Sequence, residues 1–233
     1  MSIPKNPETI VIQNQFYPKG LNEGRVYDYY QKVKQRILKE VIGKNLTFFF
    51  AVGLNNIVVM RKAKTPTGFL RLNYSNYDEL ITGRTISIHS NFGRTSDFGI
   101  VDIDIDDFDL AKRAANDVYR LIEMKCPFVN DVKLHFTGKD SFHVLCYTRR
   151  TMYVDDFRLR MRKFLMEDED SQLFKNQYTV LNKRIKGIPN LDLSSNKYLG
   201  GYITLGSLSI LGLKAMEIKI KDIFKFKKDQ AKI

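Results

Sequence analysis

Two aspartates in the stretch "FGIVDIDIDDFDL" have the residue type and the spacing of metal ligands. Side chains alternate between the two faces of a strand, so Asp102 and Asp104 share a face with Phe98 and Ile100, and they lie roughly 6 to 7 Å apart along the strand. The two metal ions of a phosphoryl-transfer site are about 3.5–4 Å apart, which such a pair can span. Ionised carboxylates this close repel each other unless a cation intervenes. We therefore interpret the pair as metal-binding, although the Asp-x-Asp pattern is short and common.

Three more aspartates follow, and they favour a structural interpretation. Asp106, Asp107 and Asp109 stand where a strand ends and an amphipathic stretch begins. Either Asp106 or Asp107 can cap the N-terminus of the helix that this stretch predicts.

Two later segments carry groups that fit phosphate and metal. The turn in "FTGKDSFHVLCY" presents small residues, backbone N–H groups and Lys139, and His143 follows on the next strand. Such a turn can bind phosphate, while an ordinary hairpin and a structural histidine are the alternatives. Further on, Asp192 can act as a third carboxylate, or it can form an ion pair with basic residues such as Lys186.

The composition favours a polyanionic partner. Lys and Arg outnumber Asp and Glu by 38 to 26 in 233 residues, which gives a net charge of +12. This excess indicates nucleic acid first and an acidic membrane second, with a lysine-rich proteome as the alternative. The sequence contains neither an apolar run of about 20 residues nor a signal peptide. Cys126 and Cys146 predict neither a metal pair nor a disulfide, so we expect a reducing, cytoplasmic location near the nucleoid.

The predicted elements place these groups on an α+β fold. Residues 24–42 predict one amphipathic helix, and 46–62 predict two strands joined through 53–56. From residue 98 the order is strand, helix, strand, strand, helix, strand, with Asp155 as the expected cap of the second helix. This is the split βαβ, or ferredoxin-like, pattern, in which helices cover one face of the sheet and leave the other for a site.

At this point the sequence resembles a known family. "VDIDID", "TGKDSFH" and "LD", in this order, resemble the archaeo-eukaryotic primase superfamily. The opening, with Tyr17, Pro18, Gly20 and "DYY" at 28–30, is similar to the polymerase domain of bacterial ligase D and its stand-alone archaeal relatives. The resemblance covers about residues 16 to 215. It implies a ferredoxin- or RRM-like primase-polymerase core at about 91–215, an N-terminal α/β module at about 1–90 and a basic C-terminal segment at 216–233, all in one domain.

The resemblance also implies an activity and its residues. The activity is template-dependent addition of ribo- or deoxyribonucleotides to DNA 3′ ends, as gap filling in non-homologous end joining. Asp102, Asp104 and Asp192 match catalytic carboxylates that bind two divalent ions, Mn or Mg. The expected nucleotide-binding residues are His89, Thr137, Gly138, Lys139, Ser141, His143, Lys186, Asn196 and Ser207. The expected partners are gapped or broken DNA, nucleoside triphosphates, Ku and a separate DNA ligase, and no membrane.

The chain departs from the family at three places. Asn22-Glu23 stands where relatives have Thr-Lys, the Lys of which helps to hold a DNA 5′-phosphate; Asp140 replaces a turn lysine, and Ser209 replaces an arginine. We expect Lys19 and Arg25 to hold the 5′-phosphate, with Glu23 turned to solvent.

Three alternative functions remain open at the level of sequence. One is a replicative or plasmid primase, which would start chains without a primer. Another is a non-catalytic nucleic-acid-binding module on a ferredoxin-like sheet, which has no need for three carboxylates. A metal-dependent nuclease is the third.

Overall fold

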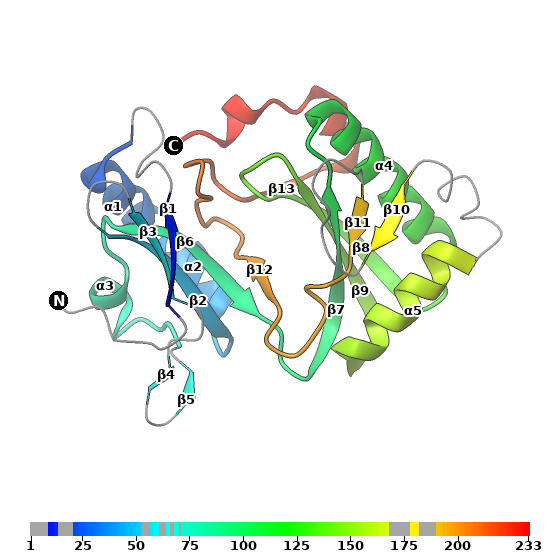
Figure 1. The fold of residues 1–233 in the computed structure, drawn as a ribbon, viewed down its shortest axis with the longest axis horizontal. Coiled ribbons are helices and arrows are strands. Elements are labelled where there is room, and N and C mark those ends of the chain that lie inside the picture. The colour runs from blue at the N-terminus through cyan, green and yellow to red at the C-terminus, as the bar shows by residue number, and fades with distance from the viewer. Residues whose placement is uncertain are drawn as a thin grey trace. The chain divides into compact units, whose positions relative to one another are not determined.

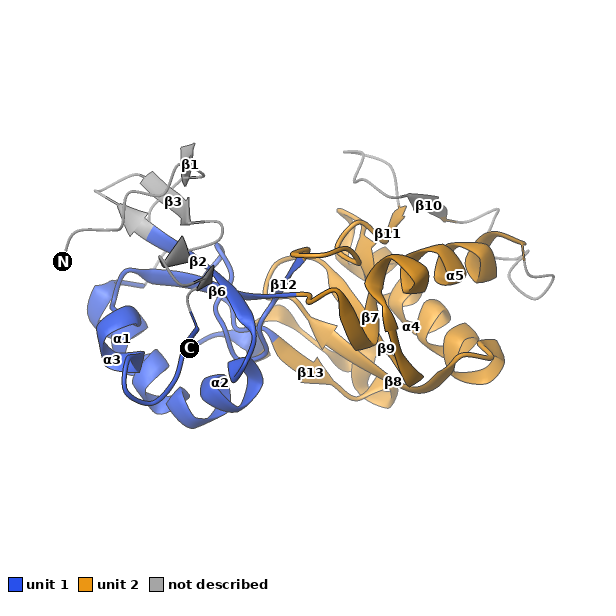
Figure 2. Cartoon of the chain, turned by 90° about the horizontal axis from the view of Figure 1, so that it is seen from below, with its two compact units in different colours: residues 1–91, 201–215, 231–233 blue, residues 92–200, 216–230 orange. Residues whose placement is uncertain are grey.

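The computed structural model describes two compact units, each built from separate stretches of the chain (Figures 1 and 2). Its described residues are 9–13, 21–52, 56–60, 64–65, 68–69, 71–167, 178–181 and 190–233. Unit 1 comprises residues 1–91, 201–215 and 231–233, and unit 2 comprises 92–200 and 216–230. Within the described ranges, every helix is too short or too polar to cross a membrane.

Unit 1 contains a five-stranded antiparallel sheet with three helices. The strand order is β1-β3-β2-β6-β12. The strands are β1 (Thr9–Gln13), β2 (Asn45–Val52), β3 (Asn56–Met60), β6 (Thr85–Asn91) and β12 (Gly201–Ile203), and a separate hairpin joins β4 (Lys64–Thr65) to β5 (Gly68–Phe69). The helices are α1 (Glu23–Lys32), α2 (Lys34–Val41) and α3 (Tyr77–Leu80). The two strands predicted within 46–62 are confirmed as β2 and β3.

The single helix predicted over 24–42 is wrong, because the structure breaks it at Val33. Asn22 caps α1, its Oδ1 accepting the N–H of Arg25 at 2.9 Å. Val33 has φ −99° and ψ 9°, far from the helical ψ of about −42°. α2 buries Ile37, Leu38 and Val41.

Unit 2 has the split βαβ arrangement that the sequence predicts. Its sheet has the order β10-β11-β7-β9-β8-β13, and α4 and α5 lie on one face of it (Figure 1). The strands are β7 (Thr95–Asp104), β8 (Val129–Phe136), β9 (Phe142–Tyr153), β10 (Thr179–Leu181), β11 (Asn190–Asp192) and β13 (Met216–Ile218); the helices are α4 (Phe108–Lys125) and α5 (Val154–Glu167). The central strands β11-β7-β9-β8 are antiparallel neighbours, as in ferredoxin-like folds. The α+β class is confirmed.

The two helices of unit 2 begin in different ways. Asp107 caps α4, since its Oδ1 accepts the N–H of Leu110 at 2.7 Å. α5 begins at Val154, which places Asp155 in the first turn instead of at the expected cap. There it accepts a hydrogen bond from Arg158 at 2.8 Å, and its charge still suits the positive end of the helix dipole.

The predicted alternation of faces along β7 holds at Gly99. A Cβ at this position would lie 2.1 Å from Cε1 of Phe157, a buried residue of α5. Gly99 therefore faces the helices, and Asp102 and Asp104, of the other parity, face the opposite side of the sheet.

We expect Gly99→Ala to lower the free energy of unfolding by about 1–3 kcal/mol, because the added methyl must displace a packed ring. Denaturant unfolding measures this. Gly24→Ala is the matched control, since a Cβ at Gly24 of α1 comes no closer than 3.4 Å to its neighbours. The control should gain a few tenths of a kcal/mol from helix propensity. Equal stability of the two variants would contradict the packing argument.

Candidate metal centre and phosphate-binding turn

Three carboxylates converge on the face of the unit 2 sheet that α4 and α5 leave free. Asp102 and Asp104 lie on β7, and Asp192 ends β11 directly opposite Asp102. Oxygen atoms from the three carboxylates lie within 4.8 Å of one another. Asp192 is only 7% exposed, and the other two are half-buried. Carboxylate oxygens are the ligands that Mg²⁺ and Mn²⁺ prefer, so this donor set fits a divalent ion.

Ser194, which the sequence analysis does not single out, fixes the third carboxylate. Its N–H donates to Oδ1 of Asp192 at 2.7 Å, and its hydroxyl donates to Oδ2 at 2.8 Å. An Asp whose side chain bonds the backbone two residues on forms an Asx-turn. The "DLS" pattern at 192–194 is the signal from which this turn could have been predicted.

The same face continues into a row of titratable residues. Directly opposed residues of neighbouring strands point to one face, and the register places His143 beside Asp102, His135 beside His143, and Glu217 of β13 beside His135. Nε2 of His143 lies 3.5 Å from Oδ1 of Asp102. His135 and Glu217 carry no role in the sequence analysis.

His143 is a neutral imidazole at physiological pH. Burial lowers its pKa from 6.5 to about 4, because the charged form would lose its hydration. The contact with Asp102 is thus between a carboxylate and a neutral ring, and at 3.5 Å it is longer than a good hydrogen bond. A neutral histidine can still donate one hydrogen bond to a ligand.

The turn from β8 to β9 is closed by its own first and last residues. The N–H and the hydroxyl of Thr137 donate to the carbonyl oxygen of Ser141 at 3.1 and 3.0 Å, and the two hydroxyls lie 2.8 Å apart. Gly138 has φ 81°, a value that favours glycine. Lys139 is half-buried in this turn, four residues before His143. Small side chains and a lysine thus meet next to the carboxylates on the same unit.

Asn196 lies in the loop after β11 and bonds to the acidic strand. Its Oδ1 accepts the N–H of Ile100 at 2.8 Å, while its Nδ2 donates to the carbonyls of Ile100 at 2.6 Å and Leu193 at 3.1 Å. Both of its amide donors bond to backbone oxygens. This geometry gives Asn196 a positioning role on β7, and contact with a nucleotide stays a prediction.

We expect Asn196→Ala to lower the free energy of unfolding by about 2–4 kcal/mol, because it leaves buried backbone groups of Ile100 without partners. Thermal or denaturant unfolding measures the loss. Asn116→Ala on α4 is the control, since Asn116 donates to Oδ1 of Asp117 and accepts from Nε of Arg120, both side-chain atoms of the same helix. A loss no larger than in the control would show that Asn196 does not hold the strand.

The remaining predicted site residues of the described chain lie in unit 1. His89 on β6 is half-buried, with its ring 4.6 Å from that of Phe49. Ser207 is fully buried, and its hydroxyl accepts the N–H of Ile88 at 2.7 Å and donates to the carbonyl of Leu208 at 3.1 Å. Their contacts with nucleotide stay predictions.

The residues around the start of α1 are already engaged within unit 1. Arg25 donates to the backbone carbonyl of Ile233 at 3.0 Å. Glu23 forms an ion pair with Arg84 at 3.0 Å, with half of its side chain exposed. Lys19 and Lys186 lie outside the described residues.

Comparison with known proteins bears on the fold. No family model matches the sequence, and the curated proteins give no match either. Among solved structures, the chain is similar to the polymerase domain of Mycobacterium tuberculosis ligase D in complex with DNA, with a TM-score of 0.71. The two chains are 11% identical over 95% of this chain and 92% of that one. The likeness confirms the type of fold that the resemblance predicts, and membership of the superfamily stays a prediction.

Proposed function

We propose that this protein is a template-dependent nucleotidyltransferase of the primase-polymerase type that adds nucleotides to DNA 3′ ends during end joining. The observation that carries the proposal is the group of three carboxylates, Asp102, Asp104 and Asp192, within 4.8 Å of one another. They share a sheet face with the buried, neutral His143 and lie beside the turn at 137–141, which can bind phosphate. The similar ligase D domain, solved with DNA, supports the assignment.

Each group has a place in the proposed reaction. Two divalent ions bound by the carboxylates would stabilise negative charge on the phosphates of the nucleotide. The turn at 137–141 would orient the triphosphate through its N–H groups, its hydroxyls and Lys139. His143 would donate a hydrogen bond to a phosphate oxygen. Ser194 keeps Asp192 aimed at the centre through its two bonds.

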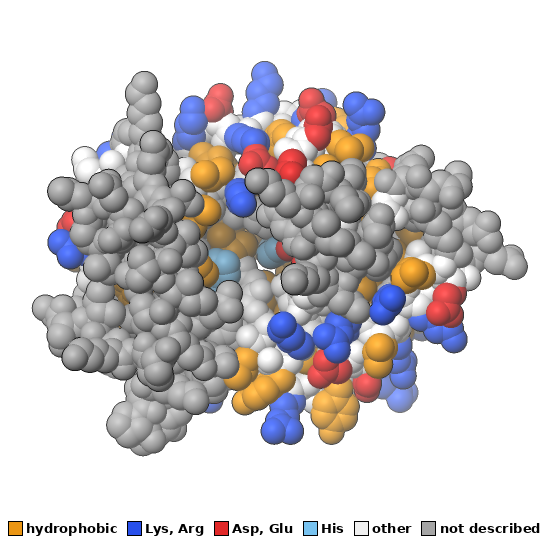
Figure 3. All heavy atoms as spheres, viewed as in Figure 1, with side chains coloured by type: hydrophobic (Ala, Val, Ile, Leu, Met, Phe, Trp, Pro, Cys, Tyr) orange, Lys and Arg blue, Asp and Glu red, His pale blue; other side chains and the backbone are white. Residues whose placement is uncertain are grey.

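Basic side chains supply the affinity for DNA. Lys and Arg recur around the rim of the described surface in Figure 3. In unit 2 the exposed basic side chains include Arg149 and Arg150 on β9. Contacts of Lys and Arg with the phosphate backbone provide most sequence-independent binding. Lys19 and Arg25 are proposed to hold a 5′-phosphate, although Arg25 also bonds to Ile233. Ku and a separate ligase would join the protein at the break, inside the cell.

Primer extension tests the proposal. Gapped DNA with a 5′-phosphate is incubated with ribo- or deoxyribonucleotides in Mg²⁺ or Mn²⁺, with primer-free template and labelled duplex alongside. Template-matched addition to the primer supports the proposal. Dinucleotide synthesis without a primer would favour a primase, and cleavage of the duplex a nuclease. DNA binding without metal dependence and without addition would favour the non-catalytic module.

A further inference from the structure

The segment after β12 and its loop returns to unit 2 and packs against the hairpin that carries the turn. β13 pairs with β8, with Met216 opposite Phe136. A 3-10 helix at Ile220–Lys225 follows, and a second one begins at Lys228. Between them Phe226 is buried, and its ring lies 5.0 Å from that of Phe136 and 6.4 Å from that of Phe142. Phe136 precedes the turn and Phe142 follows it, so Phe226 anchors the segment to both ends of the turn.

Lys228 then reaches the turn itself. Its Nζ forms an ion pair with Oδ1 of Asp140. The same ammonium lies 4.7 Å from the centre of the Phe108 ring, and that ring stacks on Phe142 at 5.7 Å. A cation over an aromatic face is attracted to it, so Lys228 is held from two directions.

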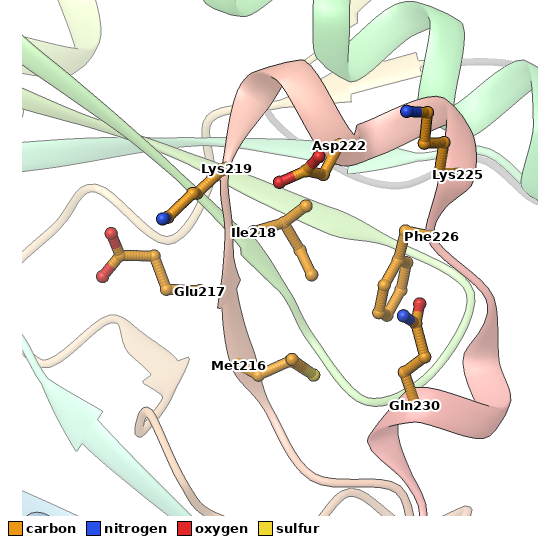
Figure 4. A pocket seen from close by; sticks show the side chains of 8 residues that line it. All are labelled: Met216, Glu217, Ile218, Lys219, Asp222, Lys225, Phe226 and Gln230. Atoms are coloured by element: carbon orange, nitrogen blue, oxygen red, sulfur yellow. The ribbon is translucent and has the colours of Figure 1, made fainter.

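Other residues of the segment, such as Ile218 and Ile223, are buried, and a hollow lies beside them. The hollow, of about 460 Å³, lies between β13 and the 3-10 helices, lined by Met216, Glu217, Ile218, Lys219, Asp222, Lys225, Phe226 and Gln230 (Figure 4). Acidic, basic and apolar side chains line this hollow together, and such a mixture indicates no particular class of ligand. The contacts of the segment with the turn and its flanking rings include those of Phe226 and Lys228.

The Lys228–Asp140 pair matters more for the charge of the turn than for the stability of the fold. The side chains are 39% and 35% exposed, and exposed ion pairs add little to the stability of a fold. A bare carboxylate at Asp140, in contrast, would repel any polyphosphate at the turn. Lys228 neutralises the charge of Asp140, although the two residues lie 88 positions apart in the sequence.

We propose that Lys228 is a positioning residue of the triphosphate site: it neutralises Asp140 and holds the turn at 137–141 in place. The inference rests on the proposed function, since it takes this turn as the triphosphate site. It assigns to the C-terminal segment a part in nucleotide affinity, with Asp140 as the group through which Lys228 acts.

Calorimetric titration of the full chain with ATP and Mg²⁺ tests the charge effect. We expect Lys228→Ala to weaken ATP affinity about tenfold, because the carboxylate of Asp140 is then uncompensated. Lys228→Ala/Asp140→Asn should be about threefold weaker than wild type, because it removes both charges but leaves the turn without the hold of Lys228. Lys227→Ala, an exposed lysine next in sequence, is the matched control and should keep wild-type affinity. Unchanged affinity in Lys228→Ala, or a double variant as weak as the single, would overturn the proposal.

Hydrogen exchange of the amides at 137–141 tests the hold on the turn without any nucleotide. The amides should exchange faster in Lys228→Ala than in Lys227→Ala, and stay fast in the double variant. Equal exchange in the two single variants would overturn the positioning role. If wild type binds no ATP at all, the proposed function falls, and the exchange rates still decide whether Lys228 holds the turn.

Discussion

Asp102→Asn and Asp104→Asn should each reduce nucleotide addition at least ~100-fold, because metal-assisted stabilisation of charge is worth several kcal/mol. Asn keeps the size of Asp and removes its charge. The loss should appear in primer extension, while affinity for gapped DNA stays near that of wild type, since basic residues supply it. If both variants retained more than about a tenth of the activity, the metal assignment would be wrong.

The same two variants should not be less stable than wild type without metal. Three carboxylates within 4.8 Å repel one another, so removal of one relieves the repulsion. Wild type should gain thermal stability from Mn²⁺, because a ligand that binds only the folded state stabilises it, and the variants should lose most of that gain. Asp106→Asn, an exposed acid two residues beyond Asp104, is the matched control and should behave as wild type in both measurements. A variant that keeps the full Mn²⁺ shift would place the metal elsewhere.

The parts of the fold that the sequence predicts are those set by local periodicity. Alternation along β7 places Asp102 on one face and Gly99 on the other, and the structure puts Gly99 against Phe157. A cap of α4 at Asp106 or Asp107 follows from their place before an apolar stripe, and the structure selects Asp107. The break at Val33 could not be predicted, because its neighbours continue the helical pattern.

The contacts that the sequence cannot predict join residues far apart along the chain. Asn196 bonds to Ile100 across 96 residues, and Lys228 pairs with Asp140 across 88. No period or short motif links such positions. The sequence likewise does not predict that residues 201–215 belong to unit 1. They join the N-terminal strands through the pairing of β12 with β6. Ser194 differs, because the Asx-turn that it forms with Asp192 is local.

His143→Ala should lower kcat/KM for the nucleotide about 10- to 100-fold, mainly through KM, because a neutral buried donor beside the turn is lost. The side chain of His143 is 10% exposed and its Nε2 lies 3.5 Å from Oδ1 of Asp102, so it can act on phosphate directly or through the carboxylate. Steady-state primer extension at varied nucleotide concentration measures the effect. His143→Gln, which keeps an N–H donor, should recover most of the loss.

The Mn²⁺-induced gain in thermal stability separates the two routes. If His143 contacts the nucleotide, His143→Ala keeps that gain, because the three carboxylates remain in place, and only nucleotide use suffers. If His143 acts by orienting Asp102, the variant loses the gain as Asp102→Asn does, and His143→Gln does not rescue it. A purely structural histidine gives a third result, in which the melting temperature falls and both kcat and KM stay at their wild-type values. That result would remove His143 from the site and leave phosphate binding to the turn at 137–141.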